Sequence, residues 1–223
     1  MTRTFLIIGL GGLGCPMALA LRRAGRLVLV DDDVVDETNL QRQILFGVAD
    51  VGRPKVEVAR AALLRRGALG VEAVRARFDE ATAGPLLHDA DVVCDGSDNL
   101  PTKFLTNDAC LRAGRKFVIA AAIRNGGNVF PVIPRETPCW RCLFEGMPDD
   151  ELPSCADAGI LGATCGQVAG VAAQAALALA TGRDPDGRLG KLWVFEGGEA
   201  RSVSFRRRPG CGGCDSPMLE VSE

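Results

Sequence analysis

The feature that most constrains the fold is a glycine-rich loop near the start of the chain, Gly-Leu-Gly-Gly-Leu-Gly at residues 9–14. It follows an apolar run typical of a buried strand, Phe5–Ile8, and precedes a stretch typical of a helix, Cys15–Ala24. Glycines at this spacing let the backbone turn tightly and approach a pyrophosphate at a helix N-terminus. We therefore predict that the glycines of this loop contact a nucleotide: Gly9, Gly11, Gly12 and Gly14.

An acidic residue follows the second predicted strand, where it can bind a ribose. The strand is the apolar run Arg26–Val30, and Asp31 comes directly after it, with Asp33 as a further candidate in the same turn. A carboxylate at this place can accept hydrogen bonds from ribose hydroxyls. The loop and the carboxylate together indicate a nucleotide site. They do not distinguish NAD from ATP, because both ligands carry a ribose and phosphates.

Two cations in the next segment favour a triphosphate. Residues 34–52 are polar and irregular. A segment of this length is longer than a simple connection between two elements needs, which favours a functional role. Arg42 lies in the sequence Asn-Leu-Gln-Arg-Gln (39–43), and Lys55 lies in Val-Gly-Arg-Pro-Lys-Val-Glu (51–57). Two positive side chains suit the charge of a triphosphate, and an NAD enzyme does not need such a pair. We predict nucleotide contacts from this segment by Asn39, Arg42, Gln43 and Lys55.

A third acidic position follows the predicted strand Asp91–Cys94, in the sequence Asp-Gly-Ser-Asp-Asn (95–99). Open α/β folds place ligands at the carboxyl ends of their strands. A carboxylate there can hold Mg²⁺ against phosphates, and we assign this role to Asp98, with Asn99 as a neighbouring contact. Asp95 is the alternative, although a residue at its position more commonly caps the turn.

Alternating apolar runs predict the fold class: α/β, with a Rossmann-like and mainly parallel sheet that continues into an antiparallel C-terminal portion. Beyond the segments above, the first half holds the predicted helices Lys55–Arg66 and Pro101–Ala113 and the predicted strands Val71–Arg77 and Lys116–Ala122. The second half reads as a return strand Asn128–Ile133, a helix Ile160–Thr181, and a hairpin of Leu192–Phe195 and Arg201–Arg206. We predict one body with a nucleotide-binding half, 1–122, and a second half, 123–223.

Four of the nine cysteines form two Cys-x-x-Cys pairs, one in each of two distant segments. The short spacing lets each pair of thiolates bind one tetrahedral Zn²⁺, and two such pairs favour a closed structural site over a redox motif. The predicted zinc ligands are Cys139, Cys142, Cys211 and Cys214. We read four further cysteines as ordinary packed residues: Cys15, Cys94, Cys110 and Cys165.

The composition argues against several classes of protein. The net charge of −2 gives no basic excess for binding nucleic acid. The apolar start of the chain looks somewhat like a secretory signal, but its glycines and its proline lie in patterned positions. No stretch looks long and uninterrupted enough to span a membrane, so we expect no membrane partner and a cytoplasmic protein.

Taken in order, these motifs resemble the ThiF/MoeB/HesA family of ubiquitin-activating-like adenylyltransferases. The resemblance covers nearly the whole chain and rests on GLGGLG, DDDVVDETNLQRQ, VGRPKVE, DGSDN, CWRC, CADAGILG and CGGC. It implies ATP-dependent adenylation of the C-terminal carboxylate of a small β-grasp protein (ubiquitin-like, ThiS/MoaD-like) that ends in Gly-Gly. The adenylate is then converted to a thiocarboxylate or conjugated. The resemblance also implies that the second half binds this partner, and that the chain forms a homodimer.

The resemblance also implies residue roles. Asp31 would bind the ribose, Asn39, Arg42 and Lys55 the phosphates, and Asp98 the Mg²⁺, while the four cysteines would hold the same structural zinc. The residues that we assign to catalysis are Arg42, Lys55, Asp98 and Cys155. Cys155 lies in the sequence Pro-Ser-Cys-Ala-Asp-Ala-Gly, where the matching cysteine of some relatives bonds to the partner or transfers sulfur, and that of others is dispensable.

The chain departs from most relatives at its start. Their first segment is helical and carries an arginine that enters the neighbouring subunit's ATP site, whereas this sequence starts at the first strand, and Arg3 lies too close to that strand to be the equivalent. Three outcomes are consistent with this difference. Another arginine takes the place of the missing one, adenylation is slow, or the chain binds its partner without adenylating it. The sequence shows no rhodanese domain, so we expect a separate sulfur donor.

Three alternative functions stay open. The first is a non-catalytic or weakly active relative that binds a β-grasp protein as a scaffold. The second is a family member that acts on a small molecule or a tRNA base, against which the zinc pairs argue. The third is an NAD oxidoreductase.

Overall fold

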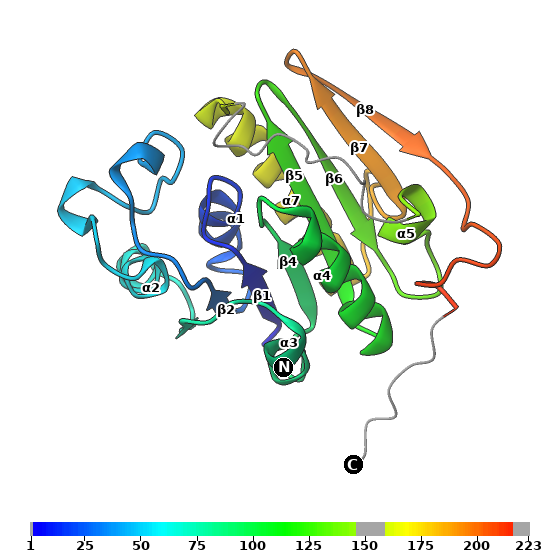
Figure 1. The fold of residues 1–223 in the computed structure, drawn as a ribbon, viewed down its shortest axis with the longest axis horizontal. Helices are drawn as coiled ribbons and strands as arrows, with labels where there is room; N and C mark the ends of the chain where they lie inside the picture. Colours follow the sequence, from blue (N-terminus) through cyan, green and yellow to red (C-terminus); the bar gives the residue numbers. More distant parts are fainter. Residues whose placement is uncertain (1, 146–158, 216–223) are drawn as a thin grey trace.

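In the computed structural model, which describes residues 2–145 and 159–215, one sheet runs through both halves of the chain. The order of its eight strands is β3-β2-β1-β4-β5-β6-β7-β8 (Figure 1). The first five strands are parallel: β1 Thr4–Ile8, β2 Arg26–Val30, β3 Val71–Val74, β4 Val92–Asp95 and β5 Lys116–Ile123. The last three pair antiparallel: β6 Gly126–Val132, β7 Lys191–Glu196 and β8 Glu199–Ser204. The predicted fold class, a mainly parallel α/β sheet with an antiparallel C-terminal portion, is confirmed.

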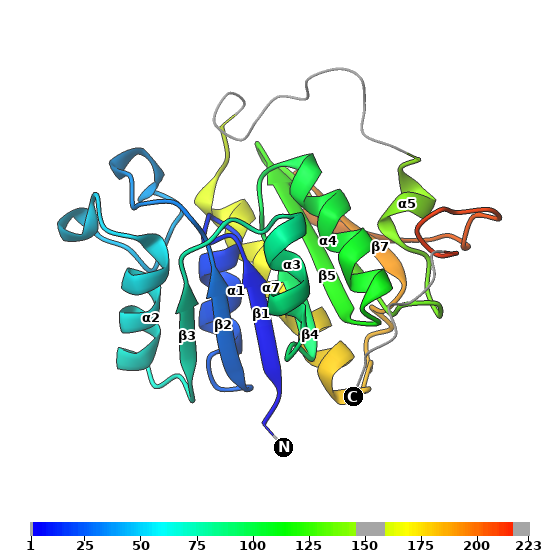
Figure 2. The ribbon, with the colours of Figure 1, turned by 60° about the horizontal axis from the view of Figure 1, so that its bottom comes forward.

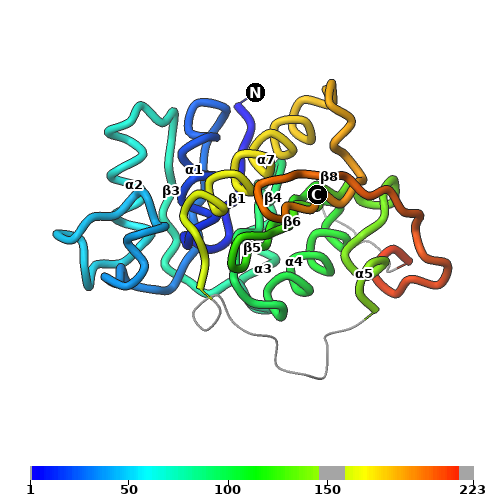
Figure 3. The backbone as a smooth tube through the Cα atoms, turned by 90° about the horizontal axis from the view of Figure 1, so that it is seen from above, coloured from blue at the N-terminus to red at the C-terminus, as the bar shows by residue number. Residues whose placement is uncertain are grey.

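Helices cover both faces of the sheet (Figures 2 and 3). One face carries α1 Gly14–Leu21, α2 Lys55–Arg65 and α7 Gly162–Thr181. The other face carries α3 Glu80–Leu87 and α4 Leu100–Arg112, with the short α5 Trp140–Leu143 beside α4. The residues of β1 alternate between the two cores, since Phe5 and Ile7 belong to the first and Leu6 and Ile8 to the second. This double burial explains the continuous apolar run in the sequence.

Helix α7 is long and apolar enough to span a membrane by length and composition, contrary to our expectation that no such stretch exists. The fold accounts for much of this composition, because 61% of its most apolar 18-residue window is buried. Its buried face consists largely of alanines, which let the helix pack closely against α1 and strands β4 to β6.

Several predicted boundaries are wrong, and two helices, α3 and the short α5, were not predicted. Strand β3 ends at Val74 instead of Arg77, because β2, its partner among the described strands, pairs with it no further than Val30. Strand β8 lies two residues earlier than expected, at Glu199–Ser204. Helix α3 was missed, although the Asp79 side chain caps it by accepting hydrogen bonds from the next turn. The irregular segment 34–52 contains two 3₁₀ turns, Glu37–Asn39 and Val48–Asp50.

The strand order creates a crevice at the centre of the sheet. Strand β1 lies between β2 and β4, so the chain leaves β1 toward one edge and later returns to β4 on its other side. The loops after β1 and β4 therefore diverge, one toward each face. A topological switch of this kind opens a ligand site beyond the carboxyl ends of the strands.

Candidate functional site

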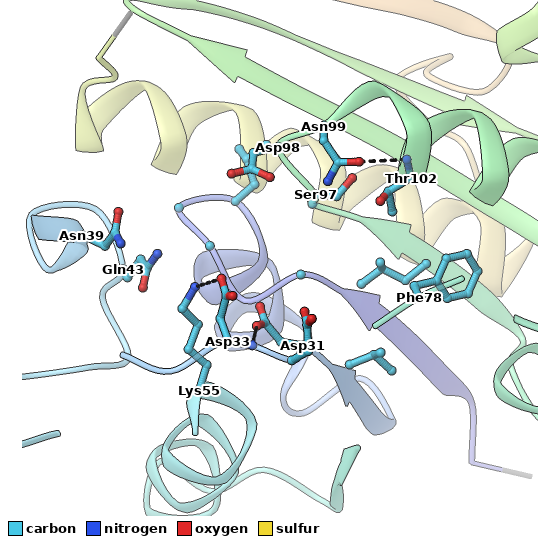
Figure 4. A pocket seen from close by; sticks show the side chains of 18 of the residues that line it. Asp31, Asp33, Asn39, Gln43, Lys55, Phe78, Ser97, Asp98, Asn99 and Thr102 are labelled. Carbon is cyan, nitrogen blue, oxygen red and sulfur yellow. Dashed lines mark hydrogen bonds and ion pairs between the residues drawn. The ribbon is translucent and has the colours of Figure 1, made fainter. Parts of the chain in front are cut away.

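A cavity of about 420 Å³ lies in this crevice, where strands β1, β2 and β4 end (Figure 4). Its lining brings together side chains from loops that are far apart in sequence. Of the predicted nucleotide residues, the lining includes Gly9, Gly11, Gly12, Asp31, Asp33, Asn39, Arg42, Gln43, Lys55, Asp98 and Asn99. The one that it does not include is Gly14.

The glycines of the first loop have different tasks. A Cβ atom on Gly14 would lie 1.7 Å from the carbonyl oxygen of Gly9, so only glycine lets α1 pack against the end of β1. Gly9 has a φ of +80°, in the left-handed region that favours glycine. A Cβ atom on Gly11 would meet nothing within 4 Å, because this residue faces the open cavity. Gly14 thus serves packing, and Gly11 leaves space for a ligand.

Asp31 is held rigidly at the end of β2. Its two carboxylate oxygens accept hydrogen bonds from the backbone N–H groups of Leu10 (2.6 Å) and Asp33 (2.8 Å). Burial raises the pKa of this carboxyl, and the nearby Lys55 opposes the shift. Each oxygen keeps a lone pair after these bonds. Asp31 can therefore still accept hydrogen bonds from the hydroxyls of a ribose.

Both predicted cations line the cavity, and each already has an oxygen partner. Lys55 is almost fully buried and forms an ion pair with Asp33 at 2.8 Å (Figure 4). The Arg42 guanidinium donates a hydrogen bond to the side-chain oxygen of Asn39. Gln43 is 3% exposed, and its side-chain oxygen has no hydrogen-bond partner among the described residues. The lining of the cavity thus includes two positive groups and a polar atom without a hydrogen-bond partner among the described residues.

The loop after β4 separates the roles of its two acids. Asp95 is fully buried and accepts hydrogen bonds from the backbone N–H (2.8 Å) and the hydroxyl (2.6 Å) of Ser97. It caps its own turn, as the alternative interpretation expected. Asp98 is exposed and lines the cavity (Figure 4). Asn99 caps α4, since its side-chain oxygen accepts a hydrogen bond from the backbone N–H of Thr102 (2.9 Å).

The analysis of the sequence missed three polar lining residues on this side of the cavity: Ser97, Thr102 and Lys103. Their place directly after the motif at 95–99 was the available signal, because the first turn of a helix that follows a strand also faces the crevice. The one histidine, His88, is exposed on the C-terminal side of α3, and its ring lies 2.8 Å from the Asp89 carboxylate.

The second candidate site is a sulfur cluster formed by Cys139, Cys142, Cys211 and Cys214, none of which lines the cavity. Sulfur–sulfur distances are 3.9 Å between Cys139 and Cys142, 3.7 Å between Cys139 and Cys211, and 3.5 Å between Cys142 and Cys214. A tetrahedral zinc with Zn–S bonds of about 2.3 Å holds its sulfurs about 3.8 Å apart. The four thiols therefore fit a zinc ion, and they are too far apart for disulfides.

Helix α4 supports the first of these cysteine pairs. The side-chain oxygen of the fully buried Asn107 accepts a hydrogen bond from the backbone N–H of Trp140 (2.8 Å). Arg141 forms two parallel bonds to the carboxylate of Asp108, at 2.7 and 2.6 Å. The backbone N–H of Arg208 donates to the Cys142 sulfur at 3.4 Å. These bonds hold the segment between Cys139 and Cys142 in place, and one of them reaches the Cys142 sulfur directly.

The other cysteines are packed within the fold. Burial raises the pKa of the Cys15 and Cys94 thiols to about 12, and Cys110 is also fully buried. Cys165 is buried as expected, but it also lines the cavity, where a Cβ atom on Gly12 would lie 2.8 Å from its sulfur. Cys155 lies outside the described residues.

Comparisons with known proteins agree with this architecture. The profile of the ThiF family matches residues 2–213. The adenylyltransferase and sulfurtransferase MOCS3 of Sus scrofa is 44% identical over 221 residues, which are 96% of this chain and 48% of that protein. The SAMP-activating enzyme E1 of Haloferax volcanii is 40% identical over 228 residues, which are 95% of this chain and 82% of that protein. The chain thus spans about half the length of the MOCS3 protein that it matches.

Solved structures share the fold. The crystal structure of E. coli MccB with ATP has a TM-score of 0.82 and is 21% identical, covering 96% of this chain and 67% of that one. MccB together with MccA-N7isoASN gives a TM-score of 0.83 at 22% identity, covering 96% and 67%.

Proposed function

The chain belongs to the ThiF family, and from this premise we propose that it is an ATP-dependent adenylyltransferase whose substrate is a small β-grasp protein ending in Gly-Gly. The observation that carries the proposal is the composition of the cavity. Arg42 and Lys55 line the same space as Asp31, so a ribose and a charged phosphate chain can be bound together. A dinucleotide needs the acid but not the pair of cations.

The proposed reaction joins two anions. An oxygen of the partner's terminal carboxylate forms a bond to the α-phosphorus of ATP. The bond from that phosphorus to the oxygen bridging it to the β-phosphate breaks, so pyrophosphate leaves and an acyl-adenylate remains. The carboxylate is already ionised and needs no general base. Arg42 and Lys55 lower the barrier by neutralising phosphate charge from positions that are fixed before the reaction begins.

Magnesium binding fits the exposed carboxylate of Asp98, which lines the same cavity as the two cations. Mg²⁺ takes oxygen ligands, commonly one or two carboxylates together with substrate phosphates. When bound, the ion would supply further neutralisation of phosphate charge. Asp98 would then hold the triphosphate between itself and the two cationic side chains.

We assign a structural zinc to the four cysteines Cys139, Cys142, Cys211 and Cys214. The sulfur distances support this assignment, and a set of four thiolates leaves no open position for catalysis. The zinc would join the segment after β6 to the segment after β8 and so stabilise the partner-binding half.

The remaining assignments extend the proposal by family resemblance. A separate sulfur donor would convert the adenylate, and Cys155 is the candidate for a covalent intermediate. We propose a homodimer in the cytoplasm, where reduced cysteines are available for metal binding.

Isotope exchange between ATP and pyrophosphate tests the proposed function. We expect exchange when the protein, ATP and Mg²⁺ are mixed with small β-grasp proteins ending in Gly-Gly, and none when the final glycine is removed. ATP binding without exchange for every such protein would contradict the proposal and favour the non-catalytic scaffold. Binding of NADH in place of ATP would reopen the oxidoreductase alternative.

Two alanine variants of the glycine loop separate folding from binding. We expect Gly14→Ala to lower the free energy of unfolding by about 2 kcal/mol or more, because its Cβ atom would collide with the Gly9 carbonyl. For a chain of this length, that loss corresponds to a melting temperature lower by about 4 °C or more. Gly11→Ala meets open space in the protein and is expected to melt within about 2 °C of the wild type.

The methyl group of Gly11→Ala projects into the cavity, where we expect it to displace a phosphate. Calorimetric titration with ATP is therefore expected to show binding at least about tenfold weaker than in the wild type, since lost charge-assisted hydrogen bonds are worth about 1.5–3 kcal/mol. Unchanged ATP affinity in this folded variant would contradict a phosphate site at Gly11.

A further inference from the structure

A buried lysine beneath the cavity has no part in the proposed function as described so far. Lys103 is 3% exposed, lines the cavity, and lies near the start of α4. Burying a lysine without partners is strongly unfavourable. Its side-chain nitrogen donates hydrogen bonds to the carbonyl oxygens of Ser97 and Ala120, both at 2.7 Å. Lys103 therefore joins the loop after β4 to strand β5.

The charge of Lys103 is balanced by Asp95. The lysine nitrogen lies 3.5 Å from a carboxylate oxygen of Asp95, which is fully buried. The other carboxylate oxygen has no hydrogen-bond partner among the described residues. Lys103 is thus the cation that compensates this buried acid within the part of the chain that the structure describes.

These two residues hold Ser97 at three of its atoms. Asp95 accepts hydrogen bonds from the Ser97 backbone N–H and hydroxyl, and Lys103 donates one to the Ser97 carbonyl. The backbone of Ser97 also packs on the glycine loop, since a Cβ atom on Gly9 would lie 3.2 Å from its nitrogen. Asp98 is the next residue, and its exposed carboxylate lines the cavity. The path of the backbone into Asp98 therefore depends on the buried pair.

We propose that Lys103 and Asp95 are positioning residues that fix the carboxylate of Asp98 for Mg²⁺ in the ATP complex. The inference rests on the proposed function, which assigns the ion to Asp98. The new element is that the buried pair Lys103 and Asp95 sets how ATP binding depends on magnesium. The pair does this without contacting the ion or the reacting atoms. A pair with a purely structural role would change stability but not the response to magnesium.

The test removes the pair without leaving an unpaired buried charge. The double variant Lys103→Met with Asp95→Asn keeps similar side-chain volumes and is neutral, which makes it milder than either single change. We measure ATP affinity by calorimetry without magnesium and across a titration with MgCl₂, together with the melting temperature. We expect ATP affinity without magnesium to stay within about threefold of the wild type. Magnesium is expected to increase the affinity for ATP. The MgCl₂ concentration that gives half of this increase is expected to be at least about tenfold higher in the double variant than in the wild type.

Asp98→Asn serves as the reference, because it removes the proposed ligand itself. We expect it to abolish the magnesium-dependent gain in ATP affinity both in the wild type and in the double variant, because both still depend on the Asp98 carboxylate. A double variant with wild-type magnesium response would overturn the inference while leaving the proposed function intact. If magnesium does not increase the ATP affinity of the wild-type protein, both the assignment of the ion to Asp98 and the inference are overturned.

A milder variant covers the case in which the double variant does not fold. Ser97→Ala removes one of the hydrogen bonds to Asp95 and keeps Lys103. We expect it to need at least about threefold more MgCl₂ for half of the magnesium-dependent gain in ATP affinity, because the lost bond to the Asp95 carboxylate holds the turn that leads into Asp98. In that case, an unchanged response of Ser97→Ala would overturn the inference.

Discussion

Replacing Lys55 with methionine is expected to lower ATP–pyrophosphate exchange by about 10²–10³-fold, a magnitude typical for the loss of one fixed group that stabilises developing charge. The side chain is almost fully buried beside the cavity, so bulk water cannot replace its charge. Methionine keeps a similar apolar stem and removes only the ammonium group. The measurement is the rate of exchange at saturating ATP, with the melting temperature as a check on folding.

Arg42→Ala is expected to reduce exchange to a similar extent, because Arg42 lines the same cavity as Lys55. Arg53→Ala is the matched control. Arg53 lies two residues before Lys55, but its side chain is 55% exposed, is paired with Asp50, and does not line the cavity. We expect this control to keep exchange within about twofold of the wild type, as for a surface salt bridge. Exchange above half of the wild-type rate in Lys55→Met would contradict the assignment.

Removing the metal from the sulfur cluster is expected to have the largest effect on stability. Structural zinc contributes its binding free energy directly to folding, and this reaches about 10–16 kcal/mol in zinc-finger peptides. We expect one zinc ion per chain by elemental analysis, and none in Cys211→Ser. Loss of even about 3 kcal/mol would lower the melting temperature by about 6 °C or more, both in this variant and after chelation.

Cys110→Ala is the matched control for the loss of a thiol. Cys110 is fully buried but lies outside the cluster. We expect this variant to keep its zinc and to lose only about 1 kcal/mol, as for a small core truncation. Zinc content that stays at one ion per chain in Cys211→Ser would refute the assignment of the cluster as its site.

The alternation of strands and helices could be predicted because both faces of this sheet are covered. Residues such as Phe5–Ile8 are apolar on consecutive positions, which marks a doubly buried strand without any knowledge of its neighbours. Helix α3 was missed because it buries only Ala83 and Leu87 and contains a proline, so its apolar pattern is weak. Its capping aspartate, Asp79, was the stronger signal. The end of β3 depended on the length of its partner strand, which local patterns do not report.

The nucleotide residues could be predicted as a group because they follow strands whose carboxyl ends meet at one edge. The hydrogen bonds and ion pairs that these residues form with one another could not be predicted from the sequence. The sequence separates Lys55 from Asp33 by a long irregular segment, and only the folded loop shows that they form an ion pair. The sequence around Lys103 carries no pattern that marks this lysine as buried. Its burial follows from the close approach of α4 to strands β4 and β5, a tertiary property.

The sulfur cluster also fixes an order of events during synthesis. Its two cysteine pairs are 72 residues apart, as between Cys139 and Cys211, and β7 and β8 lie between them in the chain. At about 5–20 residues per second, a ribosome needs several seconds to make the intervening stretch. During this interval the first two thiols have no partners from the second pair. Capture of the proposed zinc by all four sulfurs would therefore follow the synthesis of Cys214, and it would require Cys139 and Cys142 to stay reduced until then.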